Sequence, residues 1–387
     1  MGRNWQSRSY SITALREEAQ KILPRPVFDF TDGGAEDEWT LRHNESDFDK
    51  VSLLPRPLDG PGMASTATTL FGHKLSMPVI IGPTGLAGLM WPEGEACAAR
   101  AAAKAGVAYC LSHGSVCRLE DLPAPAGSHR WMQVFMYRDR GFTRELSERA
   151  AASGYNALVL TTDNQTLGNR ERDIRNGFTI PPKFKARDVL AMTTKLPWLL
   201  RMRQELPKIT FGNYVRAGEA IDIGSLAKRM SELLDPALSW RDVEWLRSIW
   251  KGPLLLKGVL HPSEAQRAVE TGIDAVIVSN HGGRQLDGAA TSISALPAIA
   301  DTVAGRIPIL LDGGIRRGTD VIKAIALGAA CCLVARPQLW GLAVAGEDGV
   351  AHMLEILRKD IQRGMTLLGA AQVDKLTRDL VQRGMPA

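Results

Sequence analysis

Residues 275–287 read AVIVSNHGGRQLD, a short β-branched run that passes directly into a polar loop. Such a run is typical of a buried parallel strand that delivers its C-terminal end to a site. The loop sets His281 three positions before Arg284, and its two glycines let backbone approach a bound molecule closely. Imidazole can move a proton near neutral pH, and guanidinium can hold a carboxylate by two parallel hydrogen bonds. The loop therefore predicts deprotonation next to a carboxylate. A histidine and an arginine at this spacing, without other evidence, are nevertheless more often a loop histidine and a surface arginine.

Eight short apolar runs recur along the chain, and most are followed by a helix-like stretch. The runs are 78–81, 107–111, 132–136, 157–160, 254–256, 275–278, 308–311 and 331–334, and alanine-rich helical segments such as 93–105, 263–270 and 319–327 lie between them. This alternation predicts an α/β fold, a (β/α)8 TIM barrel. A doubly wound sheet is the alternative, but no Gly-x-Gly-x-x-Gly motif opens a helix after the first run.

Polar residues gather where these strands are expected to end, which is where barrel enzymes carry their chemistry. In chain order they are Pro83, Thr84 and Gly85; Ser112; Gln133; Thr161 and Asp163; Lys257; His281 and Arg284; Asp312 and Arg316; and Arg336. One such residue would carry little weight. A set spread over all the runs predicts one site at the C-terminal face of the barrel.

Glycine-rich loops follow the last two runs, as Asp312-Gly313-Gly314-Ile315-Arg316 and Ala335-Arg336. Loops at these places in a barrel commonly bind phosphate through backbone N–H groups and a helix N-terminus. The two arginines favour a phosphate over glycines that merely shape tight turns. A non-redox barrel that binds a phosphosugar remains an alternative at this point.

A gap of about ninety residues separates Asp163 from the run at 254–256, far more than an ordinary βα loop. We expect a single domain over residues 1–387, with the barrel at about 75–368 and an insertion at about 175–250 over the C-terminal face. Lys and Arg alternate with Pro, Trp, Leu and Met at 181–187 and 195–203. That composition suits a segment in a membrane interface and equally a charged lid over the site. Apolar spacing predicts further helices at 12–23 and 349–368.

Composition excludes several classes of protein. The chain has 387 residues, is 45% hydrophobic and carries a formal charge of +5 with a pI near 9.0. It has no stretch near the roughly 20 apolar residues that a spanning helix needs. No spacing suggests zinc and no aromatic-interleaved basic motif suggests nucleic acid. Five cysteines without framework spacing favour a reducing compartment, and Cys331-Cys332 fits core packing. We expect a cytoplasmic protein without a metal.

Four motifs together resemble the FMN-dependent α-hydroxy-acid oxidases and dehydrogenases. They are Gly34-Ala35-Glu36-Asp37-Glu38, Pro83-Thr84-Gly85, residues 279–287, and LDGGIRRGTD at 311–320. The likeness runs from about residue 12 to 368 and is greatest to the membrane-associated mandelate and lactate dehydrogenases. It implies FMN as cofactor, oxidation of an (S)-2-hydroxy acid, mandelate-like or lactate-like, to the 2-oxo acid, and a homotetramer.

The resemblance also implies roles, position by position. The flavin ring and ribityl chain are expected against Pro83, Thr84, Gly85, Ser112, Gln133, Thr161, Lys257 and Ser279, and the ribityl and phosphate against Asp312, Gly314, Arg316, Ala335 and Arg336. His281 is the expected base and Asp163 its charge partner. Arg284 is the expected carboxylate clamp, with Arg170 as a second arginine near it. Lys257 is expected to stabilise the anionic reduced ring.

Departures from the family pattern bear on the substrate. Phe30 and Phe135 stand where most relatives place a tyrosine toward the substrate, and Gly114 stands where glycolate oxidase has a tryptophan. We expect a wider, more apolar pocket and a bulky substrate, with Tyr137 as a possible substitute for a lost hydroxyl. Ala335 replaces a glycine, and its methyl is expected to crowd the phosphate loop. The lost hydroxyls leave open a flavin-holding protein with little turnover.

The electron acceptor and the location are expected from the same comparison. Gly85 lies where family oxidases more often carry alanine, which favours a dehydrogenase that passes electrons to a quinone or other acceptor. An oxygen-using oxidase that makes hydrogen peroxide is the alternative. Peripheral attachment to the inner face of the cytoplasmic membrane is expected through residues 181–214. This segment contains seven basic residues and only two acidic ones, Asp188 and Glu205.

Overall fold

Eight parallel strands close into a barrel, in the order β10-β11-β4-β5-β6-β7-β8-β9. The computed structural model describes residues 5–178, 193–214 and 233–384. The barrel strands are β4 (Val79–Ile81), β5 (Ala108–Ser112), β6 (His129–Phe135), β7 (Ala157–Thr161), β8 (Leu254–Val259), β9 (Ala275–Val278), β10 (Ile309–Leu311) and β11 (Cys331–Val334). All eight predicted runs are therefore strands, and the TIM-barrel prediction is confirmed. They read as continuous apolar runs because both faces of each strand are buried.

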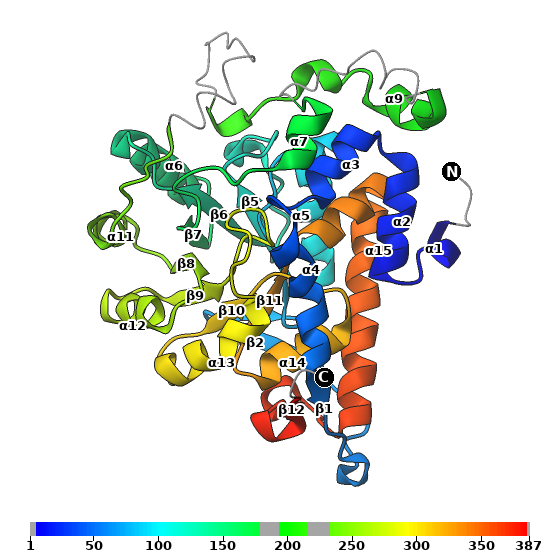
Figure 1. Ribbon diagram of the computed structural model, residues 1–387, viewed down its shortest axis with the longest axis vertical. Coiled ribbons are helices and arrows are strands. Elements are labelled where there is room, and N and C mark those ends of the chain that lie inside the picture. Colours follow the sequence, from blue (N-terminus) through cyan, green and yellow to red (C-terminus); the bar gives the residue numbers. More distant parts are fainter. Residues whose placement is uncertain (1–4, 179–192, 215–232, 385–387) are drawn as a thin grey trace.

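Helices surround this barrel (Figure 1). They are α5 (Gly94–Ala105), α6 (Arg140–Ala152), α11 (Trp240–Ile249), α12 (Pro262–Glu270), α13 (Ser292–Val303), α14 (Gly318–Ala326) and α15 (Arg336–Leu368). The β5–β6 connection departs from strict alternation, because it carries only the 3-10 turn η4 (Leu119–Asp121). The helix predicted at 349–368 is the second half of α15. The first half ends in a kink at Gly346, where φ is 59° and an added Cβ would meet the Trp91 indole at 2.5 Å.

The interior of the barrel is closed at its N-terminal end by a hairpin, β2 (Thr68–Leu70) with β3 (His73–Leu75). Leu70 and Leu75 of this hairpin pack with inward-facing strand residues such as Cys110 and Cys331. Cys332 faces the surrounding helices instead. Cys331 and Cys332 are 1% and 0% exposed, which confirms that they are core residues.

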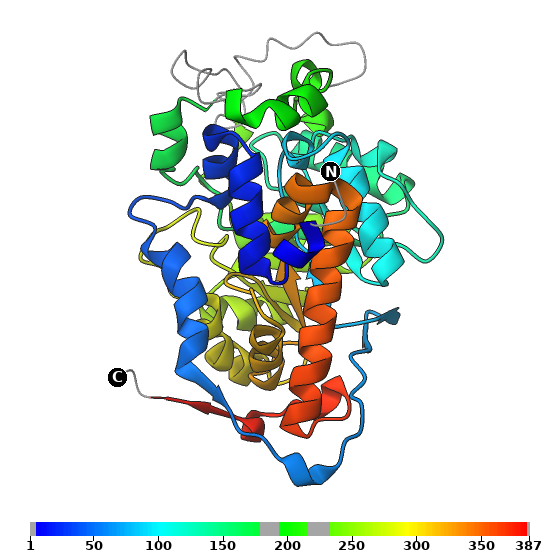
Figure 2. The same cartoon turned by 90° about the vertical axis from the view of Figure 1, so that its right-hand side faces the viewer.

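The N-terminal helices cover one side of the barrel and are α1 (Trp5–Arg8), α2 (Ile12–Ile22), α3 (Arg25–Asp32) and α4 (Trp39–Ser46). The predicted helix at 12–23 is α2, which begins where the Ser11 hydroxyl accepts from the Ala14 N–H and lies along α15 (Figure 2). Far from the site, β1 (Val51–Leu53) pairs antiparallel with β12 (Val381–Arg383).

The insertion after β7 contains α7 (Glu171–Asn176) and α9 (Leu196–Met202), and both lie with α3 at the same end of the molecule (Figures 1 and 2). Helix α11 is a barrel helix, since Val243 and Leu246 are buried in the main core. The insertion thus ends before residue 240, earlier than the expected boundary of about 250. None of the described helices is long and apolar enough to cross a bilayer.

Candidate active site

One cavity lies at the C-terminal ends of the barrel strands and receives nearly all the predicted site residues. It is lined by Phe30, Pro83, Thr84, Gly85, Ser112, Gly114, Gln133, Phe135, Thr161, Arg170, Lys257, His281, Arg284, Asp312, Gly314, Arg316, Ala335 and Arg336. Strand register brings several of them together: Ser112 pairs with Gln133, Phe135 with Thr161, and Thr161 with Lys257. Asp163 and Ser279 do not line this cavity. Asp163 contacts His281, and Ser279 contacts Lys257.

His281 is fixed in one orientation by a carboxylate. Its Nδ1 lies 2.9 Å from Asp163 Oδ1, and its backbone N–H donates to the Ser279 hydroxyl over 3.1 Å. Because an ionised carboxylate only accepts, the Nδ1 proton lies between them and Nε2 is left with a lone pair. Burial lowers the pKa of His281, against the opposing effect of Asp163. Burial would raise the pKa of Asp163, but the charges of His281 and Lys257 outweigh it and lower that pKa. His281 can therefore act as a neutral base through Nε2, and the ionised Asp163 beside it stabilises the imidazolium that results.

The His281 backbone is in the left-handed region, with φ at 58°. A bulky residue rarely adopts this conformation, and such residues cluster at functional sites where the surrounding structure enforces them.

Lys257 supplies a buried positive charge. Its Nζ donates to Ser279 Oγ over 2.9 Å and lies 3.2 Å from Asp312 Oδ2. Burial would lower the pKa of Lys257, but the carboxylates of Asp312 and Asp163 outweigh it and raise that pKa. Lys257 is therefore an ammonium at neutral pH.

Two guanidinium groups are held over the cavity by backbone carbonyls. Arg284 Nη1 donates to the oxygens of Phe30 and Gly33, over 2.8 and 2.9 Å. Arg336 donates to Gly282 and Gly33, over 3.0 and 2.9 Å. The Gly33 carbonyl therefore receives both arginines and sets the spacing between them.

Three arginines of this cavity have pKa values that are lowered chiefly by burial and further by one another. Burial, together with repulsion from Arg170, lowers the pKa of Arg284 to about 9, and burial with repulsion from Arg284 lowers that of Arg336 to about 9. Burial also lowers the pKa of Arg170. Arg316 differs, because its Nη2 donates to Glu45 over 2.7 Å. Such a cluster favours bound anions.

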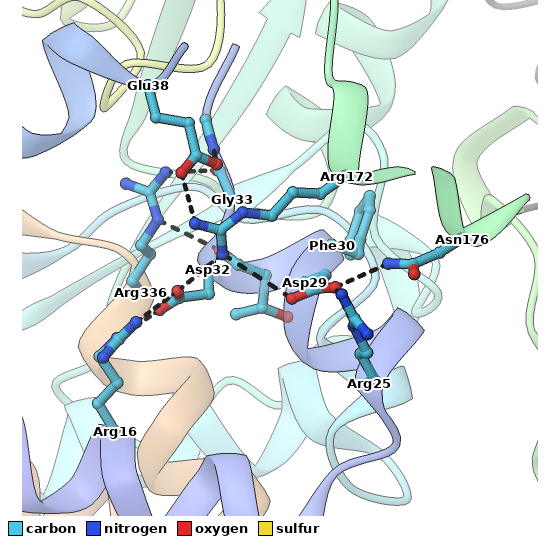
Figure 3. A network of polar contacts seen from close by, with 12 residues as sticks. Arg16, Arg25, Asp29, Phe30, Asp32, Gly33, Glu38, Arg172, Asn176 and Arg336 are labelled. Atoms are coloured by element: carbon cyan, nitrogen blue, oxygen red, sulfur yellow. Dashed lines mark hydrogen bonds and ion pairs between the residues drawn. The ribbon is translucent and has the colours of Figure 1, made fainter. Parts of the chain in front are cut away.

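An ion-pair network anchors α3 and its carbonyl groups (Figure 3). Asp32 accepts from Arg16 Nε and Nη2 over 2.6 and 2.7 Å, and from Arg172 of α7 over 3.3 Å. Arg172 also contacts Glu38, whose Oε1 accepts from the Gly34 N–H. Because these partners are far apart in the sequence, no local pattern could have identified them. The network ties the start of the insertion to the carbonyl that positions Arg284 and Arg336.

Aromatic rings line part of the cavity, and one of them lies beside Arg284. Phe30 stacks on Phe178 with centroids 4.5 Å apart, and the Arg284 guanidinium lies 5.3 Å from the Phe30 centroid. Phe135 packs against His113 with centroids 4.1 Å apart. His113 lines the cavity and was missed by the sequence analysis, although it directly follows Ser112.

The space beside Gly114 is not open, contrary to expectation. A Cβ at Gly114 would lie 3.4 Å from Phe211 Cε1, and Phe211 lines the cavity. The insertion thus supplies an aromatic ring where a larger side chain at position 114 would sit. The pocket is apolar here rather than wider.

Tyr137, expected as a substitute for a lost hydroxyl, does not reach the cavity. It is fully buried and absent from the cavity lining, and its hydroxyl lies 2.9 Å from His113 Nδ1 and 2.5 Å from the Tyr214 hydroxyl. Tyr214 belongs to the insertion and was also missed.

The sequence model of the FMN-dependent dehydrogenase family matches residues 19–383. The chain belongs to this family. Among solved structures, the monotopic membrane protein (S)-mandelate dehydrogenase is 37% identical, with a TM-score of 0.92, over 97% of this chain and 99% of that chain. Mandelate oxidase is 35% identical, with a TM-score of 0.84, over 97% and 99%. Mandelate oxidase with (S)-2-phenylpropionate is 35% identical, with a TM-score of 0.82, over the same shares.

Family membership confirms the resemblance and identifies FMN as the cofactor. The protein is an FMN-dependent hydroxy-acid oxidoreductase. The alternative of a non-redox phosphate-binding barrel is therefore wrong.

The residues present fit this cofactor. Among the described residues, Gln133 Nε2, Asp312 Oδ1 and Arg170 Nε are buried without a hydrogen-bond partner, and all three residues line the cavity. A buried polar atom left in this way costs about 1–3 kcal/mol, so a molecule with complementary donors and acceptors is favoured. The loop after β10 also requires glycine: Gly314 has φ at 84°, and a Cβ there would lie 1.8 Å from the Asn44 oxygen.

Proposed function

We propose that this protein oxidises a 2-hydroxy acid with an apolar side chain, mandelate-like rather than glycolate-like, to the corresponding 2-oxo acid. One observation carries the proposal. His281, a partly buried histidine whose Nε2 makes no hydrogen bond to any described residue, lines the same cavity as Arg284 and Arg170, whose pKa values are lowered by burial. A base beside a carboxylate clamp is what hydrogen removal at C2 of a 2-hydroxy acid requires.

Each group has a distinct task in this proposal. Arg284 and Arg170 bind the substrate carboxylate, and Arg284 is preorganised because backbone carbonyls hold its Nη1. His281 Nε2 would take one of the two hydrogens that leave the substrate, as a proton, and Asp163 would stabilise the imidazolium. Bound FMN would supply the acceptor for the two electrons and for the second hydrogen. Lys257 supplies a fixed positive charge in the same cavity.

We propose that the residues lining this cavity also bind FMN. Around the ring and ribityl chain we place Pro83, Thr84, Gly85, Ser112, Gln133, Thr161 and Lys257, with Ser279 acting through Lys257, and toward the phosphate Asp312, Gly314, Arg316, Ala335 and Arg336.

The apolar wall supports a bulky substrate. Phe30, Phe135 and Phe211 line the cavity, and a phenyl or long aliphatic substituent would bury area against them. Similar structures include a mandelate dehydrogenase and mandelate oxidases, which agrees with an aromatic substituent.

We propose a quinone or another non-oxygen molecule as the electron acceptor, because Gly85 stands where family oxidases more often carry alanine. Use of oxygen, with release of hydrogen peroxide, is the second candidate because similar structures include mandelate oxidases. The rate at which air reoxidises the reduced enzyme separates the two: slow reoxidation supports a dehydrogenase, and oxidase-like speed contradicts it.

We also propose peripheral contact with the cytoplasmic membrane through the insertion. Leu196 and Leu200 of α9 are 54% and 56% exposed, and Ile174 of α7 at the same end is 69% exposed. The similar (S)-mandelate dehydrogenase is a monotopic membrane protein. Trp198 takes no part, because it is fully buried and its indole N–H donates to the Leu89 oxygen over 3.2 Å.

Not all of the basic residues expected at this surface remain available for such contact. Lys195 Nζ donates to the Gln20 oxygen over 3.2 Å, and the Arg201 guanidinium lies 3.8 Å from the Trp91 centroid. Arg203 and Lys208 are exposed, and Lys208 pairs with Glu205 over 3.0 Å. Lys183, Lys185, Arg187 and Asp188 lie outside the described residues. The homotetramer expected from the resemblance stays a prediction.

An anaerobic panel tests the reaction. FMN-loaded enzyme is mixed with (S)-mandelate, (S)-lactate, glycolate and longer 2-hydroxy acids, and bleaching of the flavin absorbance is followed. We expect bleaching, fastest with mandelate. A yellow protein that no 2-hydroxy acid bleaches would contradict the proposal and favour a flavin-holding protein with little turnover.

A further inference from the structure

His113 is a second imidazole in the cavity, and the mechanism above leaves it unused. It is 4% exposed and lines the cavity beside Phe135, one of the two phenylalanines that lack the expected hydroxyl. Neither phenylalanine can donate a hydrogen bond, whereas an imidazole can. His113 is the candidate that the geometry offers.

The Nδ1 edge of His113 is occupied by two phenols. Nδ1 lies 2.9 Å from the Tyr137 hydroxyl and 2.5 Å from the Tyr214 hydroxyl, and the two hydroxyls are 2.5 Å apart. Neither tyrosine lines the cavity, so this edge faces away from it. Nε2, on the opposite edge, makes no hydrogen bond to any residue that the structure describes.

Counting protons in this triangle fixes the tautomer. Burial raises the pKa of Tyr137 and of Tyr214, so each hydroxyl keeps its proton. If Nδ1 is an acceptor, Tyr137 donates to Tyr214 and Tyr214 donates to Nδ1, and both protons are satisfied. If Nδ1 carries a proton, it donates to one hydroxyl, and that hydroxyl donates to the other. The proton of the second hydroxyl then has no acceptor in the triangle, which is costly. The triangle therefore favours a proton on Nε2.

His113 also stays neutral while His281 titrates. Burial, with a smaller contribution from the charge of His281, lowers the pKa of His113 to about 3. A neutral imidazole that donates from a fixed nitrogen is a suitable partner for an oxygen that is a hydroxyl in the substrate and a carbonyl in the product.

The insertion keeps this arrangement rigid. Asn213, next to Tyr214, donates to the His113 oxygen over 3.2 Å and to Ser115 Oγ over 2.9 Å, and it accepts from the Leu119 N–H over 2.8 Å. The Gly212 N–H donates to the Ser115 oxygen over 2.9 Å. Tyr214 is thus held against His113 by bonds that do not involve either side chain.

We propose that His113 Nε2–H donates a hydrogen bond to the oxygen on C2 of the bound acid, and that Tyr214 and Tyr137 hold this tautomer in place. The C2 oxygen is preferred over the carboxylate because Arg284 and Arg170 already supply two cationic donors for the carboxylate. The inference rests on the proposed function, since it supposes a 2-hydroxy acid in this cavity. His113 would then set specificity for acids that carry oxygen at C2.

The first test reads the tautomer without turnover. In protein labelled with ¹⁵N-histidine, the His113 signals are assigned as those missing from His113→Phe. We expect Nε2 protonated and Nδ1 unprotonated in the wild type, and a mixture of tautomers in Tyr214→Phe, which keeps the ring and removes the hydroxyl. A wild-type signal with the proton on Nδ1 would overturn the inference.

The second test uses a pair of ligands that differ at C2. Calorimetry on the FMN-loaded protein compares benzoylformate, which carries the C2 oxygen, with phenylacetate, which lacks it. His113→Phe should weaken benzoylformate about 10-fold or more, and should leave phenylacetate within about 2-fold of wild type, since only the donor is lost. Equal loss for both ligands, or no loss for either, would overturn the assignment.

A failure of the proposed function gives a different result. If no 2-hydroxy acid bleaches the wild-type flavin, the proposed reaction is wrong. If the wild type reacts normally and His113→Phe reacts and binds benzoylformate like it, at equal FMN content, only the role of His113 is wrong.

Discussion

Asp163 Oδ1 lies 2.9 Å from His281 Nδ1, although the two residues are 118 positions apart in the sequence. They come from the loops after β7 and β9, so β8 stands between their strands in the barrel. A Cβ at Gly258, in the β8 strand itself, would meet the Asp163 side chain at 2.9 Å. The glycine lets the carboxylate pass over β8 and reach the imidazole. The barrel therefore creates the proton-accepting pair, and the strand between them is shaped to allow it.

Replacing His281 with glutamine should leave FMN bound and slow flavin reduction by about 10²–10⁴-fold, the usual contribution of a general base. Anaerobic stopped-flow reduction with mandelate measures this. His261→Gln is the matched control, because His261 is exposed at the start of α12, and its reduction rate should equal that of the wild type. A near-normal rate in His281→Gln would rule out His281 as the base.

Asp163→Asn should change both the rate and the pH profile. Activity needs unprotonated His281, so kcat/KM falls as pH drops through the pKa of that residue. Burial lowers the pKa of His281, so in the wild type we expect this acid limb below the ordinary value of about 6.5. The asparagine removes the charge that raises this pKa, so the limb should move to still lower pH.

The plateau rate of Asp163→Asn should also fall by about 10²–10⁴-fold, because the imidazolium is no longer stabilised. A wild-type limb above pH 6.5, or a variant limb that moves to higher pH, would contradict the assigned pairing.

The barrel could be predicted because its strands are buried on both faces and read as uninterrupted apolar runs. The small sheets could not, since β1 finds its partner at the opposite end of the chain and has only three residues. The insertion expected at about 175–250 includes helix α11, although Ser239 and Asp242 form a capping box at the start of this helix. That motif was a usable signal.

The site was predicted unevenly, for physical reasons. Residues at strand ends must point to one face of a barrel, so His281 and Lys257 could be assigned to one cavity from order alone. Phe211 and Tyr214 come from an irregular insertion, where no periodicity says which side chain turns inward. The Gly33 carbonyl that receives two arginines is a backbone feature, and backbone acceptors have no sequence signature.

Replacing either arginine of the carboxylate clamp should weaken binding of the acid. We expect Arg284→Met and Arg170→Met each to raise the Kd of benzoylformate about 10-fold or more, since hydrogen bonds to a charged group are worth about 1.5–3 kcal/mol. Calorimetry on FMN-loaded protein measures this. Arg144→Met, on an exposed helix surface with its guanidinium 5.5 Å from the Trp245 centroid, is the control and should bind normally. Unchanged affinity in both clamp variants would place the carboxylate elsewhere.

The preference for a large substrate should depend on Phe211, which lines the cavity beside Gly114. We expect the wild type to prefer mandelate over glycolate in kcat/KM by about 10-fold or more, because the phenyl ring buries apolar area. Phe211→Ala should reduce that preference by lowering the value for mandelate, whereas glycolate, too small to reach this wall, serves as the internal control. A wild-type preference for glycolate would refute the bulky-substrate proposal.

Membrane attachment should depend on two leucines of α9. Leu196 and Leu200 are 54% and 56% exposed, and burying such side chains in an interface is favourable by about 25 cal/mol per Å² of apolar area. Basic groups near an anionic leaflet add about 1 kcal/mol each at low salt. We expect the protein to float with vesicles that contain anionic lipid and to be released by high salt.

The double variant Leu196→Ser/Leu200→Ser should stay in solution with unchanged flavin reduction. Leu58, in the 3-10 turn Pro57–Asp59, and Leu367, at the C-terminal end of α15, are 98% and 67% exposed. This end of α15 lies at the other end of the molecule from α9 (Figure 1), so Leu58→Ser/Leu367→Ser is the matched control and should float normally. If the wild type does not float, the membrane proposal fails while the enzyme assignment stands.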